Sequence, residues 1–167
     1  MTPTATVFGL GIVKVPVSGG HGEHRHVSSG FWPDDDSDGP LYHYCSERAA
    51  RDIIEDEPPP YFLVGTGSHH GWGMYATDIE PLDSASMDQV SSECFAGRAS
   101  AAELDHVLVL HRCNAEGCFE RVAAYQWVRG QNVPGEIIDL DTLLVEVRRW
   151  DGRAWTVLAR WDGTEWT

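Results

Sequence analysis

The amino-acid sequence predicts a strand-rich α+β domain with a few short helices, preceded by an N-terminal extension. Short apolar runs recur after residue 40, as is typical of strands, whereas two segments repeat apolar residues at helical spacing. Residues 1–40 include a stretch rich in Gly, Ser, Asp and His with little to bury, so we expect this part to be partly mobile. The 167 residues therefore divide into an extension at 1–40 and one domain at 41–167.

The first half of the domain alternates predicted strands and helices. The run LYHYC at 41–45 predicts a strand, and Ser46 is a favourable N-cap for a helix that ends before the prolines at 58–60. The run YFLVG predicts the next strand, and a glycine-rich loop then leads to the strand MYATDI at 74–79. A second helix is expected from about residue 84 to 95.

The second half reads as strands joined by turns. A hairpin is expected at 107–128, around the turn NAEG. A further strand follows from 136, with a short helical turn at 140–144. The motif W-D-G-x-x-W then occurs twice, at 150–155 and 161–166, and Asp-Gly is a strong turn signal. The tail therefore predicts a Trp-rich terminal hairpin, with contact to a sugar or a partner as the alternative.

The sequence does not decide whether its four cysteines are free thiols, disulfide partners or metal ligands. Cys45 and Cys94 are expected to be buried thiols, because free cysteine behaves as a small apolar residue. Cys113 and Cys118 flank the predicted turn and would lie close across the strands. They are compatible with two reduced thiols, with a disulfide, or with a zinc site that includes His111.

The charge excludes some classes of partner. A net charge of −14 argues against duplex DNA binding, since affinity for phosphate backbones comes from Lys and Arg. No apolar run approaches the roughly 18 residues of a membrane helix, so no membrane partner is expected. The first residues lack the pattern of a cleaved signal peptide, so we expect a cytoplasmic protein or one exported without such a peptide.

His43 and Tyr75 are the candidates for a functional site, although each residue alone is more simply explained by a structural role. His43 alone is more typical of a hydrogen-bonded structural histidine, and Tyr75 alone is typical of a strand aromatic. Together, the segments LYHYCSERAARDII at 41–54 and GWGMYATDIEP at 71–81 resemble the first two signature blocks of the ADP-ribosyltransferase fold in its H-Y branch. That branch includes diphtheria toxin, the poly(ADP-ribose) polymerases and bacterial toxin domains with a His-Tyr-Asp signature.

The resemblance implies a split β-sheet fold that uses NAD as its substrate. Such a protein transfers ADP-ribose to a protein or nucleic-acid acceptor, or hydrolyses NAD as a glycohydrolase. It also implies a bacterial toxin or effector, with a neutralising partner protein as a further expectation. The second stacking tyrosine of diphtheria toxin has no counterpart at 81–90, and HYC replaces the more usual HYT.

The resemblance also implies roles for individual residues. His43 would bind a ribose hydroxyl on the adenosine side, and the backbone of Tyr44 would hold the carboxamide. Tyr75 would stack on the nicotinamide ring, as a planar aromatic can. The glycines at 71 and 73 would allow the loop to approach the ligand closely.

These families place a carboxylate at the start of a later strand, where it stabilises the positive charge that develops on the ribose. Glu136 is the candidate for this third catalytic residue, because it opens a strand after a Gly turn. Asp139 is the second choice, on the opposite face of the same strand.

Two other functions remain open from the sequence. The first is a non-catalytic acidic binding module of the immunity or antitoxin type, which would dock on a basic partner by charge complementarity. The second is a metal-holding protein, suggested by eight histidines and the pair Cys113 and Cys118.

Overall fold

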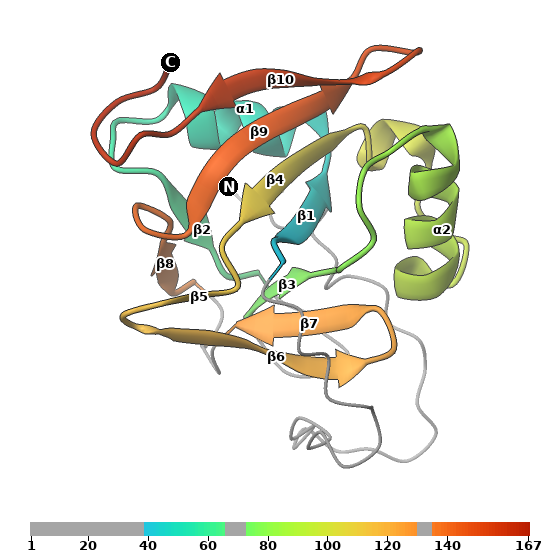
Figure 1. The fold of residues 1–167 in the computed structure, drawn as a ribbon, viewed down its shortest axis with the longest axis horizontal. Coiled ribbons are helices and arrows are strands. Elements are labelled where there is room, and N and C mark those ends of the chain that lie inside the picture. Colours follow the sequence, from blue (N-terminus) through green and yellow to red (C-terminus); the bar gives the residue numbers. More distant parts are fainter. Residues whose placement is uncertain (1–38, 66–72, 130–134) are drawn as a thin grey trace.

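The computed structural model describes residues 39–65, 73–129 and 135–167. The expectations for most of the N-terminal extension, and for Gly71 in the glycine-rich loop, lie outside these residues. The described chain is a strand-rich α+β structure, as predicted, with strands of two larger sheets set at different directions (Figure 1). No helix within these ranges is long and apolar enough to cross a membrane.

The elements follow one another in the order that the apolar runs predict. The helices are α1 (Glu47–Glu55), α2 (Ser84–Phe95) and the short 3-10 helix η3 (Ala101–Glu103). The strands are β1 (Leu41–Cys45), β2 (Tyr61–Leu63), β3 (Met74–Ala76), β4 (His106–Leu110), β5 (Cys113–Asn114), β6 (Gly117–Ala123), β7 (Gln126–Arg129), β8 (Ile137–Asp139), β9 (Leu144–Trp150) and β10 (Trp155–Arg160).

The strands form three antiparallel groups. One sheet has the order β1-β4-β9-β10, the second has the order β3-β7-β6-β5, and β2 pairs with β8 alone. The predicted helical turn at 140–144 is confirmed between β8 and β9, where the N–H groups of Leu143 and Leu144 donate to the C=O of Leu140.

The hairpin predicted at 107–128 is wrong in its pairing. β4 pairs with β1 and β9 rather than with β6, and the run expected as one strand is divided into β6 and β7 by a turn at residues 124–125. All five residues of β4 are buried. A strand buried on both faces belongs in the middle of a covered sheet, which a two-stranded hairpin does not provide.

Both α-helices begin directly after a side chain that caps them, and the cap of α1 is the predicted Ser46. The Ser46 hydroxyl accepts the N–H of Ala49 at the start of α1. Asp83 caps α2 by accepting the N–H of Ser86, and the Ser86 hydroxyl accepts the N–H of Asp83 in return. This reciprocal pair satisfies two backbone donors that the helix would otherwise leave unpaired.

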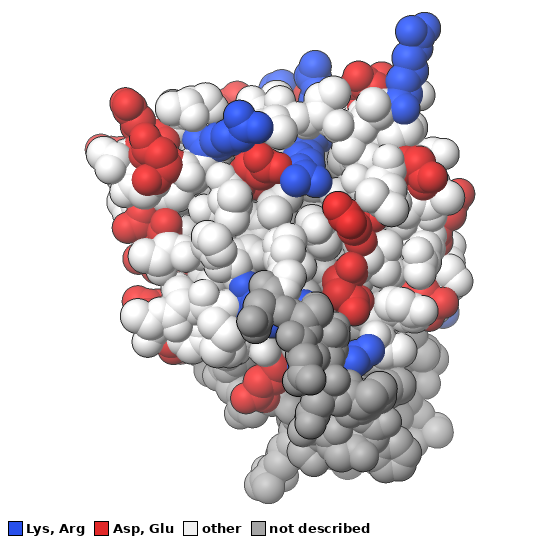
Figure 2. All heavy atoms as spheres, viewed as in Figure 1, with Lys and Arg blue, Asp and Glu red and all other residues white. Residues whose placement is uncertain are grey.

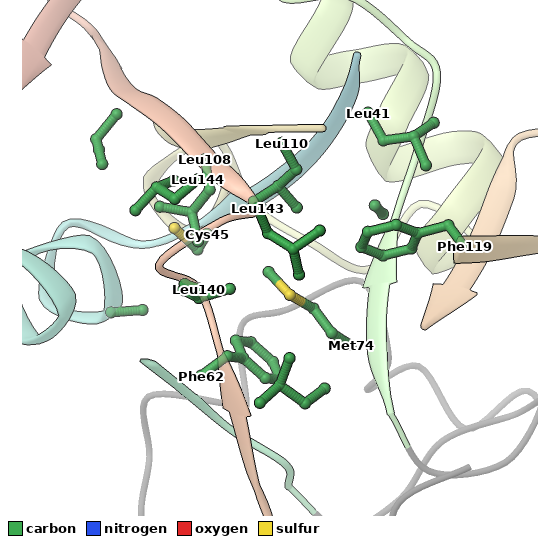
Figure 3. Packing of buried hydrophobic residues seen from close by; sticks show 14 of the residues in the cluster. Leu41, Cys45, Phe62, Met74, Leu108, Leu110, Phe119, Leu140, Leu143 and Leu144 are labelled. Atoms are coloured by element: carbon green, nitrogen blue, oxygen red, sulfur yellow. The ribbon is translucent and has the colours of Figure 1, made fainter. Parts of the chain in front are cut away.

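The core consists of two apolar clusters that share β1. Because successive side chains of a strand point to opposite faces, Leu41 and Cys45 enter the first cluster while Tyr42 and Tyr44 enter the second. Figure 3 shows the first cluster, in which Met74 of β3 points into the space between the two sheets and the β8–β9 turn. The second cluster lies on the side of α2.

The tail confirms the predicted Trp-rich hairpin and shows that the repeat forms the same turn twice. Trp150 pairs with Trp155 across the first turn, and Trp161 pairs with Trp166 across the second. In each turn the Asp carboxylate accepts two backbone N–H groups, from the residues two and three positions later. The glycine that follows each Asp has a positive φ, 98° and 94°, which explains why glycine occupies both positions.

The cysteines divide into a bonded pair and two buried thiols. Cys113 and Cys118 are directly opposite each other on β5 and β6 and form a disulfide, so the zinc alternative for this pair is wrong. Cys45 and Cys94 are free and buried, as predicted. Burial raises the pKa of Cys94 to about 12 and also raises that of Cys45, so both thiols stay protonated at neutral pH.

Alkylation tests this division. We expect a thiol reagent to label two of the four cysteines in denatured, unreduced protein and all four after reduction, as read by mass spectrometry. The double substitution Cys113→Ser and Cys118→Ser removes the cross-link of a short loop and should lower the free energy of unfolding by about 2 kcal/mol. Labelling of four cysteines without reduction would contradict the disulfide.

Candidate active site

The strands β1 and β3 meet at one pair of residues and then separate. The N–H of Tyr42 donates to the C=O of Thr77 at 2.8 Å, and the N–H of Thr77 donates to the C=O of Tyr42 at 2.9 Å. This pair is an isolated bridge. In a continued antiparallel sheet the next reciprocal pair would be Tyr44 and Tyr75. Because no bridge joins these two residues, the sheet opens between them, and the two strands run in different directions (Figure 1).

The side chain of His43 lies at this opening and replaces a backbone donor. Its Nδ1 is 2.5 Å from the carbonyl oxygen of Tyr75. A carbonyl oxygen only accepts, so Nδ1 carries the proton and Nε2 keeps its lone pair. In a continued sheet the N–H of Tyr44 would bond this oxygen; here the imidazole does so instead. Within the described residues, His43 makes no other hydrogen bond through its ring.

The opening leaves the peptide groups of the buried residue Tyr44 without a strand partner among the described residues. Alternate residues of a strand direct their N–H and C=O groups to opposite edges. The groups of Tyr42 point to Thr77, so those of Tyr44 point the same way, away from β4. Among the described residues, neither group has a hydrogen-bond partner on that side. One donor and one acceptor therefore stand side by side at the opening.

Burial decides the charge of His43. The residue is 2% exposed, and its ring packs edge-on against Phe62, with the ring centroids 5.1 Å apart. Desolvation lowers the pKa of His43 to about 4, and the hydrogen bond to the Tyr75 carbonyl opposes this only in part. At neutral pH the side chain is therefore uncharged, with a fixed tautomer.

Phe62 connects His43 to the strand that carries the predicted carboxylates. Phe62 of β2 is opposite Ile138 of β8, and the N–H of Val64 donates to the C=O of Glu136 at 2.9 Å. Glu136 directly precedes β8, and continued period-two alternation would place it on the side of Ile138, the side on which Phe62 reaches His43. Glu136 is exposed to solvent.

Asp139 has a different environment. It is opposite Tyr61 on the other face of the β2–β8 pair, and its carboxylate accepts the N–H of Asp141 at 2.8 Å. That bond closes the turn after β8 and gives Asp139 a structural role. The strand therefore separates the two predicted candidates, and only Glu136 lies on the side of Phe62.

Tyr75 is buried, and its ring does not line an open surface. It is 2% exposed and belongs to the second cluster, on the α2 side of the opening. His43 lies on the opposite face of the paired strands, and its Nδ1 is bonded to the backbone carbonyl of Tyr75. Gly73 lies directly before β3 and is half-buried. The predicted stacking face of Tyr75 is thus covered by neighbouring side chains.

Sequence reasoning missed the side chains that hold Tyr44. The Tyr44 hydroxyl donates to the C=O of Ile79 at 2.9 Å, and the ring packs edge-on against Trp155 at 5.8 Å. The repeated W-D-G-x-x-W motif was a signal for Trp pairs, but the sequence did not indicate which surface they would contact.

Charge is dispersed around the domain. On the face shown in Figure 2, the described acidic side chains are scattered among uncharged ones, and Arg side chains gather near β9 and β10. Within the described residues, no group of His, Cys, Asp and Glu is arranged to hold a metal ion.

Comparisons with protein-family models, with curated proteins and with solved structures find no match to this chain. A functional interpretation therefore rests on the geometry of its own residues.

The buried, neutral His43 predicts a pH dependence of stability. The unfolded chain binds a proton on this residue below about pH 6.5, whereas the folded chain does so only near pH 4. The stabilisation is thus complete above pH 6.5 and is lost as the pH falls toward 4, by on the order of 3 kcal/mol.

Chemical denaturation at pH 7.5, 5.5 and 4.5 measures this effect. His43→Asn serves as the control, because the Asn amide can still donate to the Tyr75 carbonyl but does not titrate. The loss of stability between pH 7.5 and 4.5 should be smaller in this variant. Equal losses in both proteins would show that His43 is not held neutral.

Proposed function

We propose that this protein is an ADP-ribosyltransferase-like enzyme that cleaves NAD between nicotinamide and ribose. ADP-ribose then passes to an acceptor or to water. The observation that carries the proposal is the opening of the sheet at Tyr44 and Tyr75, with His43 bonded across it. The resemblance of the two sequence blocks supports the same function independently.

The free edge of Tyr44 matches the carboxamide of nicotinamide. A carboxamide has one carbonyl acceptor and one NH₂ donor on the same side, and the Tyr44 peptide offers the complementary donor and acceptor. Two such hydrogen bonds fix the orientation of the nicotinamide ring. Orientation matters because the scissile bond must lie where charge can be stabilised.

Neutral His43 suits a site in which positive charge develops. When the C–N bond breaks, nicotinamide leaves with the bonding electrons and the ribose becomes cationic. A protonated imidazole nearby would oppose that charge, whereas the low pKa of His43 leaves it neutral. Its free Nε2 lone pair can accept a hydrogen bond from a ribose hydroxyl, while Nδ1 stays fixed on Tyr75.

Glu136 is the proposed catalytic carboxylate. An ionised carboxylate stabilises the cationic ribose and accepts a hydrogen bond from its 2′-hydroxyl. The nucleophile, either water or an acceptor group, then forms the new bond to the ribose carbon and loses its proton to solvent or to Glu136. Tyr75 is proposed to pack against nicotinamide, which requires the surrounding cluster side chains to shift.

Release of nicotinamide from NAD tests the proposal. We expect turnover by the wild type, a loss of about 100-fold or more in Glu136→Gln, and a comparable loss in His43→Ala. Asp139→Asn is the matched control on the same strand, and its rate should stay within about threefold of the wild type. Chromatographic measurement of nicotinamide gives all four rates.

Two results would overturn the proposal. One is the absence of nicotinamide release together with the absence of NAD binding in a calorimetric titration. The other is an equal loss in Glu136→Gln and Asp139→Asn. Tyr75 and His43 are equally buried, and removing either ring creates a cavity that lowers stability whether or not NAD binds. Tyr75 is therefore not substituted, and the loss in His43→Ala counts only if that variant melts above the assay temperature.

A further inference from the structure

The first W-D-G-x-x-W turn lies against the residue whose peptide faces the opening. Trp155 packs edge-on against the ring of Tyr44, and Trp150 packs against Trp155, with ring centroids 5.8 Å apart in each pair. The indole N–H of Trp155 donates to the C=O of Asp83 at 3.2 Å. Asp83 is the N-cap of α2, so Trp155 contacts both β1, through Tyr44, and the start of α2.

Tyr44 is thereby held at two points of its side chain. Its ring meets Trp155, and its hydroxyl is bonded to Ile79, which lies between β3 and α2. These contacts connect β1 to the chain on the far side of the opening, where the described residues of β1 and β3 are otherwise joined by the bridge of Tyr42 and Thr77 and by the bond from His43 to Tyr75. The Tyr44 side chain and Trp155 therefore hold β1 in place where backbone pairing ends.

We propose that Trp155 is a positioning residue for the peptide edge of Tyr44, and thus for nicotinamide; this role rests on the proposed function. Aromatic side chains that are held at both ends keep a fixed geometry at low entropic cost. With Trp155 in place, the donor and acceptor of Tyr44 stay in the arrangement that a carboxamide needs. Without it, the edge of β1 moves relative to β3, and the two hydrogen bonds are no longer formed together.

The second copy of the motif provides a matched control. Trp166 has the same place in its turn as Trp155, pairs with Trp161 at a ring distance of 5.3 Å, and is also partly buried. It packs on the first cluster rather than on Tyr44. Trp155→Phe and Trp166→Phe are therefore the same substitution in the same local turn, and only the first touches the proposed site.

The first measurement is the KM for NAD against kcat. A group that binds nicotinamide equally in the ground and transition states affects KM more than kcat. We expect Trp155→Phe to raise KM about 10-fold with kcat within about threefold, and Trp166→Phe to leave both within about threefold. Similar melting temperatures of the two variants would show that both fold.

The second measurement is hydrogen exchange at the amides of Tyr42 and Thr77, which needs no NAD. These amides form the backbone bridge that joins β1 to the residue directly after β3. We expect exchange to accelerate about 10-fold in Trp155→Phe and to stay unchanged in Trp166→Phe.

The outcomes separate the positioning role from the proposed function. A wild type that releases no nicotinamide overturns the proposed function and the positioning role together. An active wild type with the same KM in both variants overturns the positioning role alone. Equal exchange at Tyr42 and Thr77 in both variants also overturns it, because Trp155 would then not hold the edge.

Discussion

The hydrogen bond from His43 to the carbonyl of Tyr75 is the interaction on which the proposed site depends. It satisfies a buried acceptor that a regular sheet would give to the N–H of Tyr44. An unpaired carbonyl there would cost about 1–3 kcal/mol, so a side chain must take over if the strands are to separate. The second nitrogen of the imidazole has no hydrogen-bond partner among the described residues. One buried histidine thereby gives the Tyr75 carbonyl a partner at the point where the sheet opens.

The rest of the fold holds that opening in a fixed shape. β4 pairs with β1 along its closed edge and is itself paired with β9, and β7 pairs with β3 on the other side. Phe62 packs on the histidine ring from the β2–β8 pair, and the Trp150–Trp155 turn holds Tyr44 from the opposite face. The residues proposed to act on NAD therefore come from elements far apart in sequence, each fixed by packing that serves the core as well.

Local patterns predicted most elements because their causes are local. Ser46 and the apolar spacing after it define α1, and Asp-Gly with flanking Trp defines each turn of the tail. Strand pairing was less predictable, and β4 was assigned to the wrong neighbour. Its apolar run predicts a strand with both faces buried but does not specify which strands lie at its two edges. The sequence motifs identified His43 and Tyr75 as candidates. The peptide groups of Tyr44, which have no strand partner among the described residues, follow from how β1 and β3 pair with strands distant in sequence, and no single segment encodes that pairing. The choice between Glu136 and Asp139 likewise needed the pairing with β2.

The most direct test is whether the Tyr44 edge distinguishes a carboxamide from a carboxylate. NAD and nicotinic acid adenine dinucleotide differ only in that group, and the carboxylate lacks the NH₂ donor that the Tyr44 carbonyl would accept. A titration followed by the Tyr44 amide signal in NMR should show a shift with NAD and binding at least ~10-fold weaker with the acid analogue. Equal affinity for the two dinucleotides, or a Tyr44 signal that neither ligand moves, would contradict a nicotinamide site at this opening.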